Sequence, residues 1–181
     1  MTARSTARRR LASTAAVAAL GLGGALLTAA PASAAFLYKP IDIAQDVEVR
    51  VQSSDKCLEV ADWSTDDGAP VRQWTCTGGD NQKWRFTDGY AVNVHSGKCL
   101  EIPGYSTAAG TRVAQWTCNK GVNQRWGVVN VSQGTLAIVN FDSDLVLDIN
   151  GGGFDNGTPA IQWYPTGVYN QRWFFNPNVV L

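Results

Sequence analysis

The chain has 181 residues, with 15 basic and 15 acidic side chains and a single histidine. This length suits one domain. One histidine excludes a metal centre built from several histidines, and the balanced charge offers no basic surface of the kind that binds nucleic acid.

Residues 1–35 have the pattern of a signal peptide that is removed on export. Four arginines precede an apolar run at 11–30, and Ala32-Ser33-Ala34 forms a small-x-small cleavage site. Polar residues and glycines interrupt the run, which argues against an uncleaved membrane anchor. We therefore expect a secreted mature protein, residues 36–181, with 11 basic and 15 acidic residues and a net charge of −4. Neither nucleic-acid binding nor membrane insertion is expected of it.

The mature chain opens with segment 36–46, which has no counterpart later in the sequence. Three readings stay open for this segment: a pairing arm, an ordered cap or a short tail.

A threefold repeat follows. Three segments end in nearly the same phrase, namely Asn81-Gln82-Lys83-Trp84, Asn123-Gln124-Arg125-Trp126 and Asn170-Gln171-Arg172-Trp173. A second tryptophan precedes each by ten residues, at Trp74, Trp116 and Trp163, and the phrases Cys57-Leu58-Glu59, Cys99-Leu100-Glu101 and Val146-Leu147-Asp148 begin 17 residues earlier still. We place unit 1 at about 47–86, unit 2 at 89–128 and unit 3 at 135–175. The third copy begins five residues late, which predicts an insertion between Trp126 and Val146 that leaves each unit intact.

The four cysteines follow the same register. Cys57 and Cys76 are 19 residues apart, as are Cys99 and Cys118, and unit 3 lacks both members of the pair. A bonded pair predicts this joint absence, so we expect the disulfides Cys57–Cys76 and Cys99–Cys118. Disulfides fit an oxidising compartment.

The local pattern within the units is strand and turn. Residues 47–51, 91–94 and 145–149 are short β-rich runs separated by glycine-containing turns, and the mature chain shows no sustained helical period. Three units of about forty residues are too few for a usual propeller. The expected fold is therefore an all-β β-trefoil with pseudo-threefold symmetry.

The Gln-x-Trp triplets at Gln82, Gln124 and Gln171, with their upstream Cys-Leu-acid phrases, resemble the ricin-B-type lectin repeat. That family includes carbohydrate-binding modules of secreted glycosidases. The resemblance covers about residues 47–175. It implies about twelve strands, one shallow sugar site in each unit and a galactose- or xylose-type carbohydrate as partner.

The resemblance also assigns site residues. An acid binds sugar hydroxyls, a tryptophan stacks on the sugar ring, an asparagine reaches a hydroxyl and the glutamine supports it. These positions hold Glu59, Trp74, Asn81 and Gln82 in unit 1, Glu101, Trp116, Asn123 and Gln124 in unit 2, and Asp148, Trp163, Asn170 and Gln171 in unit 3. The closing tryptophans, Trp84, Trp126 and Trp173, are expected in the core.

Two departures separate the units. The family has aspartate at the acid position, which only unit 3 retains, and the longer glutamate shifts the carboxylate by about 1.5 Å. The family's glutamine two residues before the stacking tryptophan is replaced, by Arg72 in unit 1. Glutamine stands one residue later in every unit, where a strand points it to the opposite side. We therefore expect Asp148 and Trp163 to form the favoured site, with Trp63 and Tyr105 as possible extensions of the other two.

Three classes of function come into consideration, namely a lectin, an enzyme and a protein-binding trefoil. The sequence lacks a Gly-x-Ser-x-Gly elbow, and no carboxylate pair stands out for glycoside hydrolysis, so no catalysis, metal or cofactor is expected. A protein-binding trefoil, such as a protease inhibitor or toxin-associated adhesin, is the alternative to a lectin. It would not need an acid–tryptophan–asparagine set in each unit.

Overall fold

The computed structural model describes residues 38–132 and 134–178, so the predicted signal peptide lies outside the described residues. The described part contains thirteen strands, six short 3-10 turns and no α-helix. The strands are β1 Lys39–Pro40, β2 Ile43–Val51, β3 Cys57–Val60, β4 Val71–Trp74, β5 Lys83–Thr87, β6 Tyr90–Asn93, β7 Cys99–Glu101, β8 Ala114–Trp116, β9 Trp126–Ser132, β10 Thr135–Asn140, β11 Val146–Ile149, β12 Ala160–Trp163 and β13 Trp173–Asn176. The turns are η1 Ala61–Trp63, η2 Asp80–Gln82, η3 Pro103–Tyr105, η4 Val122–Gln124, η5 Asn150–Gly152 and η6 Tyr169–Gln171. No helix in this part of the chain is long and apolar enough to cross a membrane.

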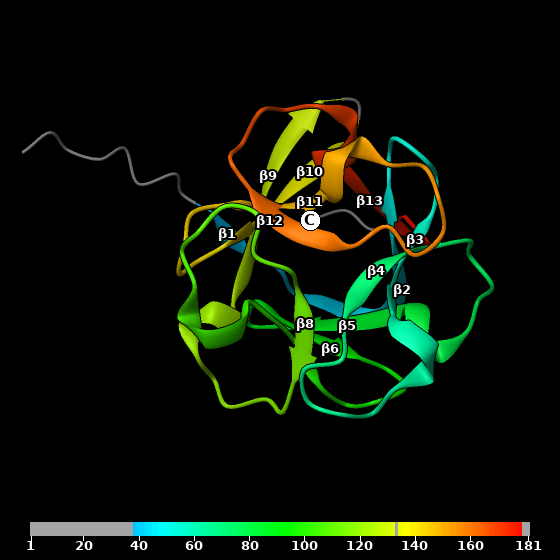
Figure 1. Ribbon diagram of the computed structural model, residues 1–181, viewed down its shortest axis with the longest axis vertical. Helices are drawn as coiled ribbons and strands as arrows, with labels where there is room; N and C mark the ends of the chain where they lie inside the picture. The colour runs from blue at the N-terminus through cyan, green and yellow to red at the C-terminus, as the bar shows by residue number, and fades with distance from the viewer. Residues whose placement is uncertain (1–37, 133, 179–181) are drawn as a thin grey trace, which may run out of the picture. The chain divides into compact units, whose positions relative to one another are not determined.

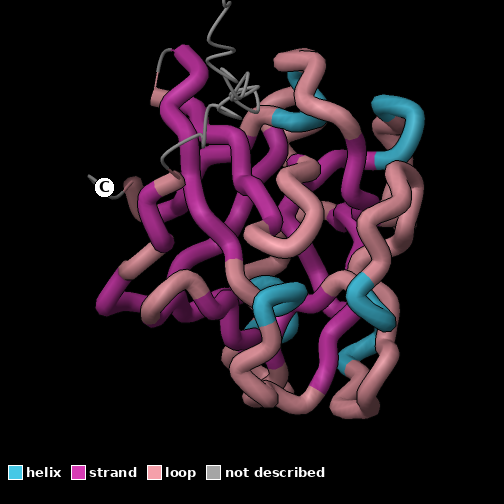
Figure 2. Tube along the Cα trace, turned by 90° about the vertical axis from the view of Figure 1, so that its left-hand side faces the viewer, coloured by secondary structure: helices cyan, strands magenta, loops and turns pink. Residues whose placement is uncertain are grey.

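The strands form a trefoil, as the repeat predicts. Six of them pair in the order β9-β10-β13-β2-β5-β6, and a bridge between Tyr90 and Arg125 links the two ends of this run. Each unit adds one hairpin, β3–β4, β7–β8 or β11–β12. Bridges join the three hairpins to one another, at Pro70–Ala114, Arg112–Ile161 and Arg72–Pro159. Figure 1 shows the three lobes that result, and Figure 2 shows the short helical turns lying within the loops.

The core depends on alternating burial and on the three closing tryptophans. Strand β2 buries every second residue from Val47 to Val51, the pattern expected of a strand with one face inward. Trp84, Trp126 and Trp173 are completely buried, which confirms their predicted core position. Each indole N–H donates a 3.0 Å hydrogen bond to a backbone carbonyl on the first hairpin strand of its own unit. A buried polar group needs such a partner.

Strand β1 is the one strand beyond the twelve that the resemblance implies, and it lies in segment 36–46. Strand β1 pairs with β9, Ile41 is completely buried, and Ile43 begins β2 with only 4% of its surface exposed. The described part of segment 36–46 is therefore a pairing arm, one of the three readings that the sequence left open.

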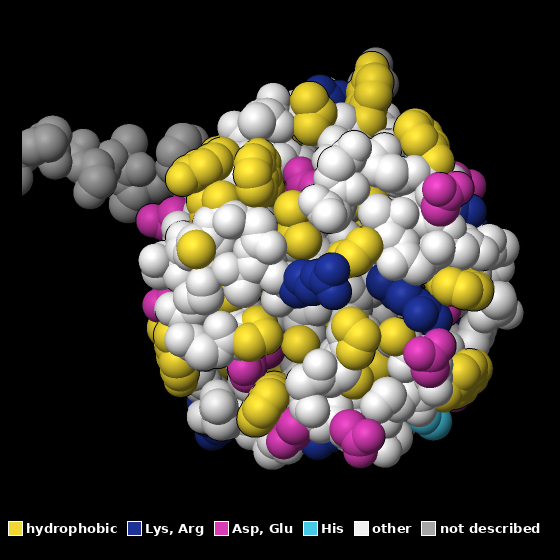
Figure 3. All heavy atoms as spheres, in the orientation of Figure 1, with side chains coloured by type: hydrophobic (Ala, Val, Ile, Leu, Met, Phe, Trp, Pro, Cys, Tyr) yellow, Lys and Arg dark blue, Asp and Glu magenta, His cyan; other side chains and the backbone are white. Residues whose placement is uncertain are grey.

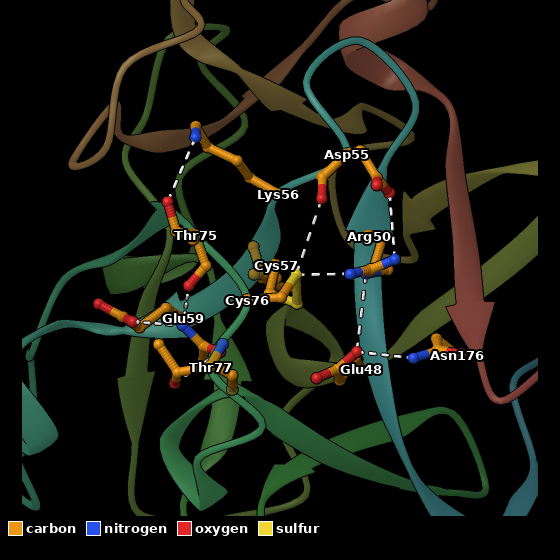
Figure 4. Close-up of a disulfide and its surroundings, with 12 residues drawn as sticks. Glu48, Arg50, Asp55, Lys56, Cys57, Glu59, Thr75, Cys76, Thr77 and Asn176 are labelled. Carbon is orange, nitrogen blue, oxygen red and sulfur yellow. Dashed lines mark hydrogen bonds and ion pairs between the residues drawn. A yellow bond between two sulfur atoms is a disulfide. The ribbon is translucent and has the colours of Figure 1, made fainter.

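The insertion and the disulfides lie where the register predicts. The five extra residues lengthen the β9–β10 hairpin compared with β5–β6. Disulfides join Cys57 to Cys76 and Cys99 to Cys118, so both predicted bonds are confirmed. Figure 4 shows the first of these, with Glu59 on the same strand as Cys57 and close to Thr75 and Thr77. Each bridge ties the strand that carries the acid to the segment that follows the stacking tryptophan.

Candidate functional site

In every unit the predicted acid and glutamine are hydrogen-bonded to each other. The glutamine Nε2 donates to one carboxylate oxygen over 2.8 Å in unit 1, 2.6 Å in unit 2 and 2.7 Å in unit 3. The same Nε2 donates to the carbonyl of the residue after the stacking tryptophan. All three acids are buried. A charge-assisted bond of this kind orients the carboxylate and leaves its second oxygen to other partners.

The predicted asparagines lie beside the acids. Each side-chain Nδ2 donates to a backbone carbonyl, that of Val60, Ile102 or Ile149, over 2.9 to 3.1 Å. Asn170 also donates to Asp148 Oδ1 over 3.1 Å. The Oδ1 atoms of the other two asparagines, Asn81 and Asn123, are buried and have no hydrogen-bond partner among the described residues. The units therefore present different polar groups around the same backbone.

An aromatic side chain packs near the asparagine in units 1 and 2. A Cβ placed on Gly79 would meet the Trp63 ring and Asn81 Oδ1, and one placed on Gly121 would meet the Tyr105 hydroxyl and Asn123 Oδ1. Trp63 and Tyr105 have φ of 56° and 54°, a region that costs an L residue about 1–2 kcal/mol.

Unit 3 has a small residue where the other two units have the aromatic side chain, and a larger residue where they have the glycine. The aligned residues are Gly152 in place of the aromatic and Val168 in place of the glycine. Gly152 has φ of 64°, so the unit keeps the same backbone without strain on a large side chain. Both residues line the hollow in front of Asp148.

The predicted stacking tryptophans are partly exposed. Trp116 and Trp163 expose 40% and 41% of their surface, and Trp74 is half-buried. Each ring lies against a glycine in the loop of a neighbouring unit, with Gly68 beside Trp116, Gly110 beside Trp163 and Gly157 beside Trp74. One side of each site is therefore built by another unit. Exposed apolar side chains are spread around the face seen in Figure 3.

The glutamines one residue before these tryptophans hold the neighbouring loops. Gln73, Gln115 and Gln162 are completely buried. Each Nε2 donates to two loop carbonyls at 2.7 to 3.0 Å, those of Gly153 and Asp155, Ser64 and Asp66, or Ser106 and Ala108. The alternation of the strand correctly placed these side chains away from the site. Their role as clamps between units was missed, although glutamine recurs in all three copies.

The four predicted residues of unit 3 surround an open hollow of about 400 Å³. Its wall contains Asp148, Trp163, Asn170 and Gln171, and Ile161 stands at the position of Arg72. Burial raises the pKa of Asp148, while the hydrogen bonds from Gln171 and Asn170 oppose that shift. The hollow combines an exposed indole with a hydrogen-bonded carboxylate, the combination that recognises a sugar ring.

In unit 2, one oxygen of the acid has no hydrogen-bond partner among the described residues. Gln124 binds Glu101 Oε2, whereas Glu101 Oε1 accepts no hydrogen bond from any described residue. Ala114 stands at the position of Arg72 and places no polar group there. Burial raises the pKa of Glu101, the bond from Gln124 opposes the shift, and the charge of Asp67 adds to it.

Unit 1 brings the four predicted residues together but adds Arg72 to them. The Arg72 guanidinium forms an ion pair with Glu59 and lies over the Trp74 ring. The sequence showed that the family's glutamine was missing here, but it did not show where the arginine points.

An apolar hollow marks the place of the missing third disulfide. Val146 and Pro165 occupy the two cysteine positions, and both line a hollow of about 180 Å³ together with Val129 and Val139. Unit 3 therefore has an apolar hollow where the other two units have a covalent bond.

Comparisons with solved structures support the fold. A designed threefold-symmetric protein, ThreeFoil, is 36% identical with a TM-score of 0.70, over 75% of this chain and 99% of that one. An exo-β-1,3-galactanase from Clostridium thermocellum is 30% identical with a TM-score of 0.70, over 77% of this chain and 31% of the enzyme. The agglutinin of Rhizoctonia solani is 26% identical with a TM-score of 0.66, over 76% of this chain and 98% of the agglutinin.

Sequence comparisons give a short match and a family. A 39-residue segment is 41% identical to the probable lipoprotein EnvE of Salmonella typhimurium, and the match spans 22% of each chain. Residues 40–92 and 80–163 match the ricin-type beta-trefoil lectin domain-like family. These two overlapping matches span residues 40–163, most of the trefoil. The chain belongs to the ricin-type beta-trefoil lectin domain-like family.

Proposed function

We propose that this protein is a secreted, non-catalytic lectin that binds carbohydrate through the acid, tryptophan, asparagine and glutamine of its repeats, with up to three shallow sites and the strongest in unit 3. The observation that carries the proposal is the hollow of unit 3, where the exposed Trp163 ring and the buried Asp148 carboxylate line the same wall. Family membership supports carbohydrate binding as the general activity.

Recognition follows from these groups. The apolar C–H face of a sugar ring packs on the Trp163 indole, and hydroxyls on the edge of the ring donate to the Asp148 carboxylate. Asn170 and Gln171 hold that carboxylate in position through bonds of 3.1 and 2.7 Å. No bond of the sugar is broken in this arrangement, so binding without hydrolysis is the expected activity.

The proposed ligand is a galactose- or xylose-type oligo- or polysaccharide. The similarity to the exo-β-1,3-galactanase supports the galactose class. The match spans only 31% of that enzyme, and no catalytic activity is carried over from it. Shallow sites bind single sugars weakly, so several sites on one chain gain affinity for a polymer through effective concentration.

Export is part of the proposal. Two disulfides within one small domain suit an oxidising compartment outside the cytoplasm. The partial match to a probable lipoprotein points the same way. Fractionation of cells that produce the full-length chain tests this step, and retention in the cytoplasm with free thiols would contradict it.

A glycan array on the wild type and on Glu59→Ala, Glu101→Ala and Asp148→Ala tests the function. We expect the wild type to bind galactose- or xylose-containing glycans, and Asp148→Ala to lose most of the signal. If the wild type binds no glycan on the array but binds a protease tightly, the protein-binding alternative would be favoured. Turnover of a bound polysaccharide would contradict the assignment as a non-enzyme.

A further inference from the structure

Arg72 takes up both groups that a sugar needs in unit 1. Its Nε and Nη2 each lie 3.1 Å from Glu59 Oε1. Its Cζ lies 4.3 Å from the centroid of the Trp74 ring. The carboxylate oxygen left free by Gln82 and the face of the indole are therefore both engaged by one side chain.

A second carboxylate, the exposed Asp62, also contacts the arginine. Arg72 Nη2 lies 2.9 Å from Asp62 Oδ1, and only 19% of the Arg72 side chain is exposed. A planar guanidinium suits this position because it bonds carboxylates with its edge while its face stacks on an aromatic ring. The guanidinium therefore contacts the Trp74 ring with its face and the Glu59 and Asp62 carboxylates with its edge.

The other two units lack such a group. Ala114 and Ile161 stand at the aligned positions and carry no charge. In unit 2, Glu101 Oε1 has no hydrogen-bond partner among the described residues, and in unit 3 only Asn170 donates to Asp148 Oδ1. The bond from the glutamine to the acid occurs in all three units, whereas a charged residue at the position of Arg72 occurs in unit 1 alone.

We infer that Arg72 acts as an internal ligand that closes unit 1 to sugars, so that the wild-type protein binds through units 2 and 3 only. This inference rests on the proposed function. A neutral sugar would have to displace a charged group from a buried carboxylate, and a hydroxyl is a weaker partner for a carboxylate than a guanidinium is. Arg72 is thus a specificity-determining residue, and unit 1 is a latent site.

The test isolates unit 1. Trp116→Ala with Trp163→Ala removes the stacking rings of the other two units, which expose 40% and 41% of their surface, and thermal unfolding checks that the double variant is folded. Binding to lactose-coated, β-1,3-galactan-coated and xylan-coated surfaces is then measured with Arg72 intact and with Arg72→Ile, Arg72→Ala or Arg72→Lys. We expect no binding with arginine and at least about a tenfold gain with isoleucine or alanine. Lysine, which keeps the charge but lacks the planar face, should give a smaller gain.

Two outcomes of this experiment overturn the inference. One is binding by the isolated unit 1 with Arg72 intact that equals binding by the isoleucine variant. The other is weaker binding after Arg72→Ile, which would make the arginine a sugar ligand. Wild-type protein that binds none of the three surfaces counts against the proposed function and not against closure by Arg72.

If the wild-type protein binds none of the three surfaces, closure of unit 1 by Arg72 is tested by a measurement that needs no sugar. Thermal unfolding is compared for Arg72→Ile, Glu59→Gln and the double variant. Closure predicts that the double variant loses less than the sum of the two single losses in unfolding temperature, because each single change breaks the same pair. Losses that add fully would show that the two side chains act independently, and the inference would then be wrong.

Discussion

Gln171 Nε2 donates to Asp148 Oδ2 over 2.7 Å, and this bond links the Gln-x-Trp triplet of the repeat to the acid 23 residues earlier. The same bond recurs in the other two units. The triplet therefore has two roles in each unit, because its tryptophan fills the core and its glutamine positions the buried carboxylate of the candidate site. Fold and site share one sequence signal for this reason.

Loss of the Trp163 ring should weaken sugar binding more than loss of the Trp116 ring. An aromatic contact contributes about 1 kcal/mol beyond the area that it buries, so Trp163→Ala should lower the affinity for the best array ligand by at least about fivefold. Both rings are similarly exposed, so Trp116→Ala compares the contribution of unit 2 with that of unit 3 after the loss of a similarly placed ring. Isothermal titration measures both variants. Equal affinity in wild type and Trp163→Ala would contradict the assignment of unit 3.

Binding by unit 3 should weaken in acid at a higher pH than an exposed aspartate would require. Burial raises the pKa of Asp148 above its ordinary value of 3.8, and the ionised form accepts the sugar hydroxyls. In the Trp116→Ala background, we expect affinity to fall as the pH is lowered through this raised pKa. Affinity that stays constant down to the ordinary aspartate pKa would contradict binding through an Asp148 carboxylate whose pKa is raised.

The raised pKa of Asp148 should also make the free energy of unfolding fall as the pH rises. The folded protein holds the Asp148 proton more tightly than the unfolded chain does, because its pKa is raised. The free energy of unfolding therefore loses this contribution as the pH rises from the ordinary value through the raised one. Comparison of wild type with Asp148→Asn in urea across that range isolates the effect, since the amide does not titrate. A difference that does not change with pH would contradict it.

Loss of a glutamine clamp should lower the free energy of unfolding whichever unit carries it. Only loss of the clamp beside Trp163 should also weaken sugar binding by unit 3. Gln162→Leu leaves the Ser106 and Ala108 carbonyls and the Ser143 hydroxyl without their partner, which should lower the free energy of unfolding by about 2–4 kcal/mol. It should also weaken sugar binding, because the freed loop carries Gly110 against Trp163.

Gln115→Leu is the matched control for this clamp. It breaks the equivalent bonds to Ser64 and Asp66, in the loop of unit 1 that carries Gly68 against Trp116. When both variants are made in the Trp116→Ala background, which removes the stacking ring of unit 2, Gln115→Leu should show a similar loss of stability with unchanged sugar affinity. Equal loss of affinity in both variants would show a general effect of unfolding and not a local one.

A third disulfide should form if both cysteines are restored. Val146 and Pro165 have the same separation as the two natural pairs and face a common apolar hollow. Val146→Cys with Pro165→Cys should therefore oxidise and raise the free energy of unfolding by about 3 kcal/mol, since the closed loop is of the same size. Thiol titration and urea unfolding, with the reduced form as control, check this. Two persistent free thiols would show that the hollow holds these positions apart.

The fold was predictable because three copies carry the same information. A shared register identified the core tryptophans, and the joint absence of two cysteines in unit 3 identified the disulfide pairs. The arm at Lys39–Pro40 occurs once, so no repeat pointed to its pairing with β9.

The site was less predictable because its differences depend on side-chain direction. The residues of all three units come together as the resemblance implies, yet Arg72 closes one set by turning onto Trp74 and Glu59. The sequence shows the arginine but not its conformation. The exchange of Trp63 for Gly152 is readable from the alignment of units, whereas its effect depends on packing against the asparagine.

A crystal structure of the wild-type protein with the best array oligosaccharide tests the central claim most directly. The account predicts a sugar ring stacked on Trp163, with a hydroxyl within hydrogen-bond distance of Asp148, and Arg72 still lying over an empty Trp74 face. A sugar bound away from all three tryptophans, or stacked on Trp74 while unit 3 is vacant, would contradict it.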